Sequence, residues 1–349
     1  MRKFGRPVIC RKELVGRNGQ PVAYKFTPQP INKRLEIQIN VANNQMAKDY
    51  WNSEYGEWLR DAQVFWQQCI TGLRYTSVQQ WCVINFDVKP TLQNNVLGIA
   101  GPGDGSMFTG VVDIGGLNNV LSSLRLYDGK YATPGFSTMH FSAAHYKLNP
   151  VTPTEIQRKE AFFVTAVHEM AHCLGFGLWN GDYRIVADMG ILGRWKLPSF
   201  PTALTPAFPH NNVTTGDPHN VRYTGTAARN AWRETMVGQS TASGIYLENY
   251  GMKSNTTMSN AGATAGSHWK QGYHDPLNTT INGWTGSDTG IKDYQGRDMR
   301  DELMTGWSNS NRWRNTWVGK FTVAQFEDMG YTVNYLPLSI PLHEYRTEV

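Results

Sequence analysis

The segment between Thr152 and Gly175 constrains the fold of this chain more than any other part of its sequence. Thr152 is a typical N-cap residue, Pro153 suits the first helical position, and Glu155 completes a capping box. Gly175 suits the residue that ends a helix in the left-handed conformation. We therefore expect one long helix between these signals, and the apolar run at 161–167 predicts that it is buried.

His168, Glu169 and His172 form the pattern HExxH within this helix. Positions four apart lie on one face of a helix, so both imidazoles can reach one metal ion while Glu169 faces a water molecule beside it. Zinc lowers the pKa of such a water, and a nearby carboxylate can take its proton. The pattern is short enough to arise by chance, and two ordinary histidines are the alternative. Its mid-helix setting after an apolar run favours the zinc interpretation.

A catalytic zinc usually has three protein ligands, so the third must come from outside the helix. Continuation to Gly175 gives HExxHxxG, which opens the metzincin pattern. In that pattern another histidine follows three residues after the glycine, but Leu178 stands there and cannot bind a metal. The third ligand is therefore expected among the other histidines, which are His140, His145, His210, His219, His268, His274 and His343.

Several separate motifs resemble the leishmanolysin-like branch of the metzincin zinc peptidases, in which a long insertion separates the glycine from the third histidine. They are HEMAHCLGFG at 168–177, GSHW at 266–269, ELMTG at 302–306 and FTVAQFEDMGY at 321–331. The stretch YTGTAARNAW at 223–232 is similar to part of the family's insertion. The resemblance spans about residues 35–335, although only these motifs carry it.

The resemblance implies a site with three zinc ligands, a general base and a methionine in the turn beneath the metal. The zinc ligands that it implies are His168, His172 and His268. The general base is Glu169, and the methionine is Met304. His274 is the alternative third ligand. Trp269 and Trp307 adjoin the site and are candidates for the walls of a substrate cleft.

The expected fold class is α+β and metzincin-like, with a twisted mixed sheet and two long helices in the N-terminal lobe and a loop-rich C-terminal lobe. Strands are predicted at 35–41, 81–88, 96–100, 138–146 and 331–335, and helices at 46–70, 152–174, 227–236 and 321–329. Peptides commonly bind along an edge strand, and 138–146 is the predicted edge strand of the cleft.

These predictions divide the chain into five parts. They are an N-terminal arm (1–34), a catalytic lobe with the zinc helix (35–180), an insertion (181–265), a C-terminal lobe with the third ligand and Met-turn (266–335), and a tail (336–349).

The composition argues against several classes of partner. A net charge of +5 over 349 residues, without a dense Lys/Arg stripe, gives little support to nucleic-acid binding. No apolar run approaches the roughly 20 residues of a membrane helix. The basic start is not followed by an apolar stretch of signal-peptide length, so we expect no export by the ordinary route.

Four cysteines lie far apart and form no CxxC pair, which excludes a zinc ribbon and a dense disulfide scaffold. Cys10 prompts one hypothesis. Some metzincins are kept latent by an N-terminal cysteine that occupies the fourth zinc position, and zinc favours thiolate. A buried structural cysteine is the favoured interpretation of Cys10.

The function we expect is that of a zinc-dependent endopeptidase acting on polypeptides. The alternative is a structural or attachment subunit of a larger particle, such as a virion or phage tail, that keeps a peptidase fold. A non-peptidase zinc hydrolase is a third, weaker alternative. The sequence assigns no compartment, and both virion association and release outside a cell are compatible with it.

Overall fold

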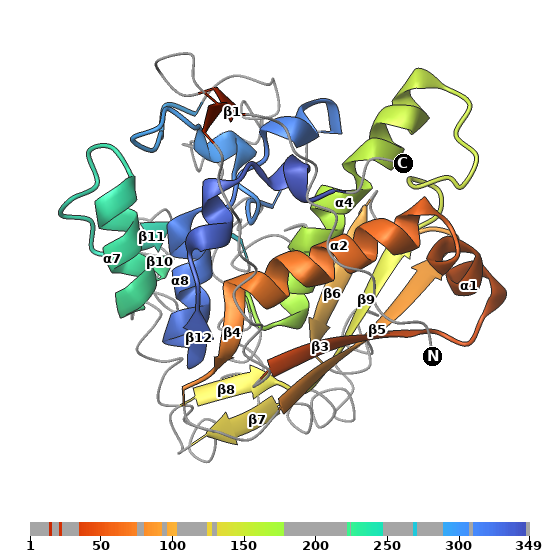
Figure 1. Ribbon diagram of the computed structural model, residues 1–349, viewed down its shortest axis with the longest axis horizontal. Coiled ribbons are helices and arrows are strands. Elements are labelled where there is room, and N and C mark those ends of the chain that lie inside the picture. Colours follow the sequence, from red (N-terminus) through yellow and green to blue (C-terminus); the bar gives the residue numbers. More distant parts are fainter. Residues whose placement is uncertain are drawn as a thin grey trace, which may run out of the picture.

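The computed structural model describes residues 14–15, 21–22, 35–74, 80–92, 96–102, 124–127, 131–177, 222–223, 225–246, 268–270, 289–306 and 310–346. They form an α+β fold around a mixed four-stranded sheet (Figure 1). The sequence-based predictions for Cys10, His210, His219, His274 and Trp307 lie outside these residues.

The central sheet has the strand order β3-β5-β9-β6. Strands β3 (Leu35–Val41), β5 (Gln80–Lys89) and β9 (Phe136–Ser142) are parallel, and β6 (Gly98–Pro102) runs antiparallel to β9. Apolar residues alternate along β5, and those on one face are buried beneath the helices. The predicted mixed sheet is therefore confirmed.

Within the described residues the edge strands of this sheet are β3 and β6, and the prediction that 138–146 is an edge strand was wrong. Strand β9 lies between β5 and β6, and it ends at Ser142, so that His145 falls in the turn that follows. Its residues are mostly buried, as expected for an inner strand. The segment that directly precedes the long helix in sequence is therefore not the edge strand beside that helix. The short stretch GIAGP, which is β6, forms that edge strand.

The predicted helix at 46–70 is two helices, α1 (Gln45–Trp51) and α2 (Glu54–Cys69). Ser53 restarts the chain as an N-cap whose side chain accepts a hydrogen bond from the Tyr55 amide. At Gly56 a Cβ atom would overlap the carbonyl of Trp51, so only glycine allows the first turn of α2 to approach the end of α1 this closely. Hydrophobic periodicity continued across this break and did not reveal it.

The long helix α4 (Pro153–Cys173) follows its sequence signals closely. The Thr152 hydroxyl accepts from the Glu155 amide at 3.3 Å, and the Glu155 carboxylate accepts from the Thr152 amide at 3.1 Å. Gly175 has φ of 108°, the left-handed conformation expected after a helix. The capping box and the glycine stop are both confirmed.

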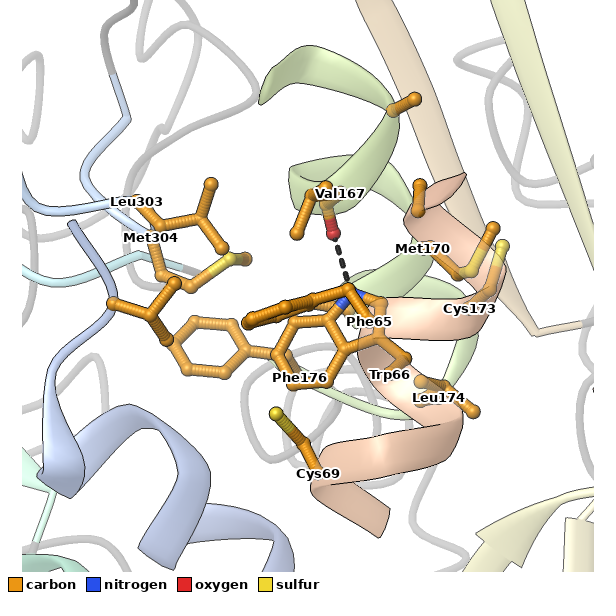
Figure 2. Close-up of a cluster of buried hydrophobic side chains, with 14 of the residues drawn as sticks. Phe65, Trp66, Cys69, Val167, Met170, Cys173, Leu174, Phe176, Leu303 and Met304 are labelled. Atoms are coloured by element: carbon orange, nitrogen blue, oxygen red, sulfur yellow. Dashed lines mark hydrogen bonds between the residues drawn. The ribbon is translucent and has the colours of Figure 1, made fainter. Parts of the chain in front are cut away.

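Helices α2 and α4 pack together over the sheet (Figure 1). Their contact is partly aromatic. Phe162 of α4 makes edge contacts with Tyr55 and Tyr146, at centroid distances of 4.7 and 5.0 Å. The Trp66 indole of α2 donates a 2.8 Å hydrogen bond to the carbonyl of Val167, one residue before the first site histidine (Figure 2). Helix α2 therefore fixes α4 at the level of the site.

The C-terminal part closes against the N-terminal part. Helices α7 (Thr226–Thr235) and α8 (Lys320–Asp328) pack side by side, close to the predicted positions. Strand β12 (Tyr331–Val333) pairs antiparallel with β4 (Ile70–Leu73), which directly follows α2. Ile70, the last residue of the helix predicted at 46–70, is the first residue of β4.

The remaining elements are short. Pairs of strands form between β1 (Leu14–Val15) and β2 (Pro21–Val22), between β7 (Leu124–Tyr127) and β8 (Tyr131–Pro134), and between β10 (Arg222–Tyr223) and β11 (Ile245–Tyr246). Short 3-10 helices occur at Met299–Asp301, Ser310–Asn315, Leu336–Ser339 and Leu342–Tyr345. In the tail, the Arg346 guanidinium stacks on Trp58 and donates to the carbonyl of Glu160, which holds this segment on α2 and α4.

Candidate metal centre

Three histidines from two distant parts of the chain converge on one point. The Nε2 atoms of His168 and His172 lie 3.2 Å apart, and each lies 3.0 Å from Nε2 of His268. Tetrahedral ligands about 2.0–2.1 Å from a zinc ion would be about 3.3 Å apart. The three nitrogens therefore have a spacing close to that of three ligands of one metal ion, and this group could hold a metal.

The hydrogen bonds on the far side of two rings fix their tautomers. His168 Nδ1 lies 2.7 Å from the Leu303 carbonyl, and His172 Nδ1 lies 2.8 Å from the Phe176 carbonyl. A carbonyl oxygen only accepts, so each Nδ1 carries the proton and each Nε2 presents a lone pair. Two lone pairs facing each other at 3.2 Å repel, and a cation between them removes the repulsion. The donor set thus fits a metal ion, with the outer hydrogen bonds common to metal-binding histidines.

Burial keeps these imidazoles neutral. Desolvation lowers the pKa of His168 to about 4, although the hydrogen bond to Leu303 opposes the shift. Desolvation and the neighbouring His168 lower the pKa of His172 to about 3. Neutral imidazole is the form that binds metals, so both histidines are in the form that could bind a metal at neutral pH without losing a proton.

Glu169 lies on the same helix with its carboxylate against the edge strand. The side chain is only 5% exposed, and a Cβ atom placed on Gly98 of β6 would be 2.7 Å from Oε1 of Glu169. Burial raises the pKa of this carboxyl group to about 8. No residue in the described part of the chain donates a hydrogen bond to it. The Glu169 carboxylate is therefore close to β6 and not committed to a structural contact there.

The third histidine is held by the segment that carries Met304. The Trp269 amide donates to the Met304 carbonyl at 2.9 Å, directly after His268. The preceding Leu303 carbonyl accepts from His168, so one dipeptide contacts a helical histidine and the residue that follows the distant histidine. Met304 is fully buried in the apolar cluster that includes Phe176 (Figure 2).

Glu302 is a site component that the sequence analysis missed as an individual residue. Its buried carboxylate accepts from the Met304 amide at 2.6 Å, the Gly319 amide at 3.0 Å and the Thr322 hydroxyl at 2.6 Å. Desolvation nevertheless raises its pKa to about 7. The sequence shows only that Glu302 stands two positions before Met304. This spacing does not indicate that Gly319 and Thr322 donate hydrogen bonds to its carboxylate.

The structure places Trp269 in the core instead of on a cleft wall. It is completely buried, and its ring packs against Phe176, Tyr223 and Phe321 at centroid distances of 5.0 to 5.9 Å. Its large apolar ring is stabilised there by contacts on several sides. The corresponding prediction for Trp307 lies outside the described residues.

The other described histidines lie away from the three that converge. His140 is on β9, with Nδ1 3.5 Å from the Asp87 carboxylate, and His343 packs beside Trp313 in the tail. His145 is in the turn after β9. Within the described residues, the group of metal-ligand side chains that assembles is the one formed by His168, His172 and His268.

No protein-family model matches this chain, and no match to a curated protein was found. Among the described residues, no helix has both the length and the apolar content to cross a membrane.

Proposed function

We propose that this protein is a zinc-dependent endopeptidase of the leishmanolysin-like metzincin type. The observation that carries the proposal is the convergence of three imidazole nitrogens within 3.2 Å of one another, on a buried helix that also carries Glu169. Catalytic zinc sites commonly use three protein ligands and leave a fourth position open.

The donor set favours zinc among the common metals. Neutral imidazole nitrogens suit zinc and other late transition metals, whereas calcium and magnesium prefer oxygen ligands. Non-haem iron oxygenases typically use two histidines and one carboxylate, but here the third ligand is His268. Three histidines with an open fourth position are the pattern of a hydrolytic zinc site.

When bound, zinc supplies Lewis-acid chemistry, in which it activates water and polarises a carbonyl group. Glu169 would take the proton of the attacking water and pass it to the leaving amine. Its pKa of about 8 without metal reflects burial alone, and a nearby dication favours the ionised form that a base requires. The low polarity around Glu169 strengthens that interaction.

A polypeptide is the substrate class that the surroundings of Glu169 favour. Strand β6 pairs with β9 on one side, and no strand pairs with its other side within the described residues. An extended peptide can add to such an edge through main-chain hydrogen bonds. Because Glu169 contacts Gly98 of β6, a peptide bound there would pass close to the base.

The separate motifs that resemble the metzincins meet in space, which supports the family proposal. HEMAHCLGFG supplies two ligands, GSHW supplies His268, and ELMTG supplies the Leu303 carbonyl that orients His168. The closing motif supplies α8 and β12, next to the same segment. Motifs that arose by chance would have no reason to share one site.

The decisive experiment compares Glu169→Gln with Glu160→Gln, which changes a partly exposed carboxylate on the same helix. The wild type and both variants should each bind one equivalent of zinc. Cleavage of casein or a peptide library should be lost in Glu169→Gln, retained in Glu160→Gln and abolished by chelation. Equal cleavage by Glu169→Gln would refute the mechanism. Zinc binding with ester or glycoside hydrolysis, but no peptide cleavage, would favour another type of hydrolase.

A further inference from the structure

The third ligand depends on different support from the other two. His168 and His172 are fixed by the geometry of α4, whereas His268 lies in an irregular segment, of which residues 268–270 are described. Trp269 and Lys270 attach this segment to the rest of the protein through their amides, which donate to the carbonyls of Met304 and Tyr246 at 2.9 Å each.

The side chain of Trp269 adds a third attachment. Its indole Nε1 donates a 2.8 Å hydrogen bond to the hydroxyl of Thr322, and both residues are fully buried. The same hydroxyl donates to Oε1 of Glu302 at 2.6 Å. An indole nitrogen can only donate, so the directions are fixed along the series from Trp269 to Thr322 to Glu302.

Glu302 ends this series at the turn that also orients His168. Its other oxygen, Oε2, accepts from the Met304 amide, and Met304 in turn accepts from the Trp269 amide. The result is a closed ring of hydrogen bonds that includes the residue after His268 and the residue after Leu303. Every group in the ring is buried, where an unmade hydrogen bond is costly.

We propose that Thr322 and Glu302 are positioning residues for the metal centre, holding His268 at its distance from the two helical ligands through Trp269. The inference rests on the proposed function, because it assumes that the three histidines hold zinc. It goes further by assigning a role to residues that touch neither the metal ligands' nitrogens nor the substrate. Residues that orient metal ligands commonly change metal affinity when they are replaced.

The test uses Thr322→Val, which keeps the shape of the side chain and removes the hydroxyl, and Thr322→Ser, which keeps the hydroxyl. Tyr50→Phe is the matched control, because it removes one buried hydroxyl that donates to the Tyr146 carbonyl in the N-terminal core. Zinc affinity is measured by chelator competition, and ligand geometry by the visible spectrum of the cobalt-substituted protein.

Thr322→Val should bind zinc about 10-fold more weakly and show an altered cobalt spectrum, as for other residues that orient ligands. In Thr322→Ser, zinc affinity and the cobalt spectrum should be close to those of wild type. Tyr50→Phe should lower the unfolding temperature without changing zinc affinity or the cobalt spectrum. If Thr322→Val does not fold, Glu302→Gln is measured in the same way, with the same expected loss of zinc affinity.

Unchanged zinc affinity in the folded variant would overturn the positioning role. So would an equal loss in Tyr50→Phe, because affinity would then follow overall stability. A wild-type protein that binds no zinc would instead overturn the proposed metal centre on which the inference rests.

Discussion

The burial of Glu169 gives this single residue a measurable effect on stability. In an unfolded chain a glutamate has a pKa near 4.3, whereas in the folded, metal-free protein burial raises the Glu169 pKa to about 8. Between these values the unfolded chain has released its proton and the folded protein has not. The contribution of Glu169 to stability is therefore present at low pH and lost as the pH rises through this window.

We therefore expect metal-free wild type to lose stability relative to Glu169→Gln between about pH 4.5 and pH 8, the range over which this group titrates. Chemical unfolding at several pH values would measure the difference. Both proteins contain the same histidines and Glu302, so their titrations cancel in the comparison. Parallel stability curves would show that Glu169 is not desolvated as described.

Gly98 offers a second prediction at the scale of one residue. A Cβ atom there would lie 2.7 Å from Oε1 of Glu169, so Gly98→Ala has to displace the proposed base. We expect a loss of peptide cleavage of at least about 10-fold, which corresponds to about 1.4 kcal/mol of transition-state stabilisation, while zinc affinity changes little. Zinc titration and peptide kinetics on one preparation would separate these effects.

Gly238→Ala is the matched control for this substitution. Gly238 has φ of 71° and nothing near its Cβ position, so the alanine should cost stability without affecting cleavage. If both variants lost activity to the same extent, the contact between Gly98 and Glu169 would not explain the effect.

At this scale the sequence predicted two ligands and the base from local spacing alone. His268 is 96 residues from His172, and no periodicity connects them, so only the resemblance to a family selected it among seven histidines. The hydrogen bonds of Glu302 and Thr322 were beyond prediction, because they depend on how α8 meets the Met304 segment.

At the scale of helices, two N-termini lack a capping side chain of their own. Gly225 precedes α7 and Gly319 precedes α8, and neither has a side chain that could accept a hydrogen bond. Acidic residues from elsewhere bind at both ends. Asp328 replaces the cap of α7 by accepting from the Ala227 and Ala228 amides, and Glu302 accepts from the Gly319 amide before α8 and from the Thr322 hydroxyl in its first turn. A Cβ on Gly225 would overlap the Asp328 carboxylate, which explains the glycine.

Asp328→Ala tests this arrangement. The carboxylate accepts from the Ala227 and Ala228 amides at 2.8 and 3.1 Å, so the substitution removes the cap of α7. We expect a loss of about 1–2 kcal/mol in the free energy of unfolding, as for other N-caps. Urea titration would measure the free energy of unfolding. A variant as stable as wild type would contradict the capping role of Asp328. The exposed Asp49→Ala is a control that leaves α7 and α8 untouched.

The elements that were predicted well carry their own boundary signals. Thr152, Glu155 and Gly175 define α4 locally, and the alternation at 35–41 defines β3. The break between α1 and α2 and the identity of the edge strand were missed, because each depends on contacts between segments. Gly56 is one example. A side chain at this position would overlap the Trp51 carbonyl, and that overlap is known only once the folded chain brings Trp51 beside it.

At the scale of the whole molecule, a metal ion would join two separate regions of the chain. Two of the proposed ligands lie on α4 and the third lies in the segment 268–270, beside α8. Zinc at a free concentration 100 times its Kd should stabilise the folded protein by about 2.7 kcal/mol. We therefore expect chelation to lower the thermal unfolding temperature.

Two variants make this prediction specific. Glu169→Gln keeps all three ligands and should show the same response to chelation as wild type, whereas His268→Gln should show much less. Differential scanning calorimetry with and without chelator would measure the shifts. A wild-type response in His268→Gln would exclude His268 as a ligand.

The pairing of β4 with β12 affects the order in which the protein can mature. The Thr71 side chain donates to the carbonyl of Thr332, a residue 261 positions later, so β4 leaves the ribosome long before its partner. Until then, a growing chain has α4 with two histidines but neither the third ligand nor the final strand. Nascent chains stalled before residue 268 should therefore be sensitive to added protease and unable to cut other proteins, so that hydrolytic capacity would appear only after His268 and β12 have been synthesised.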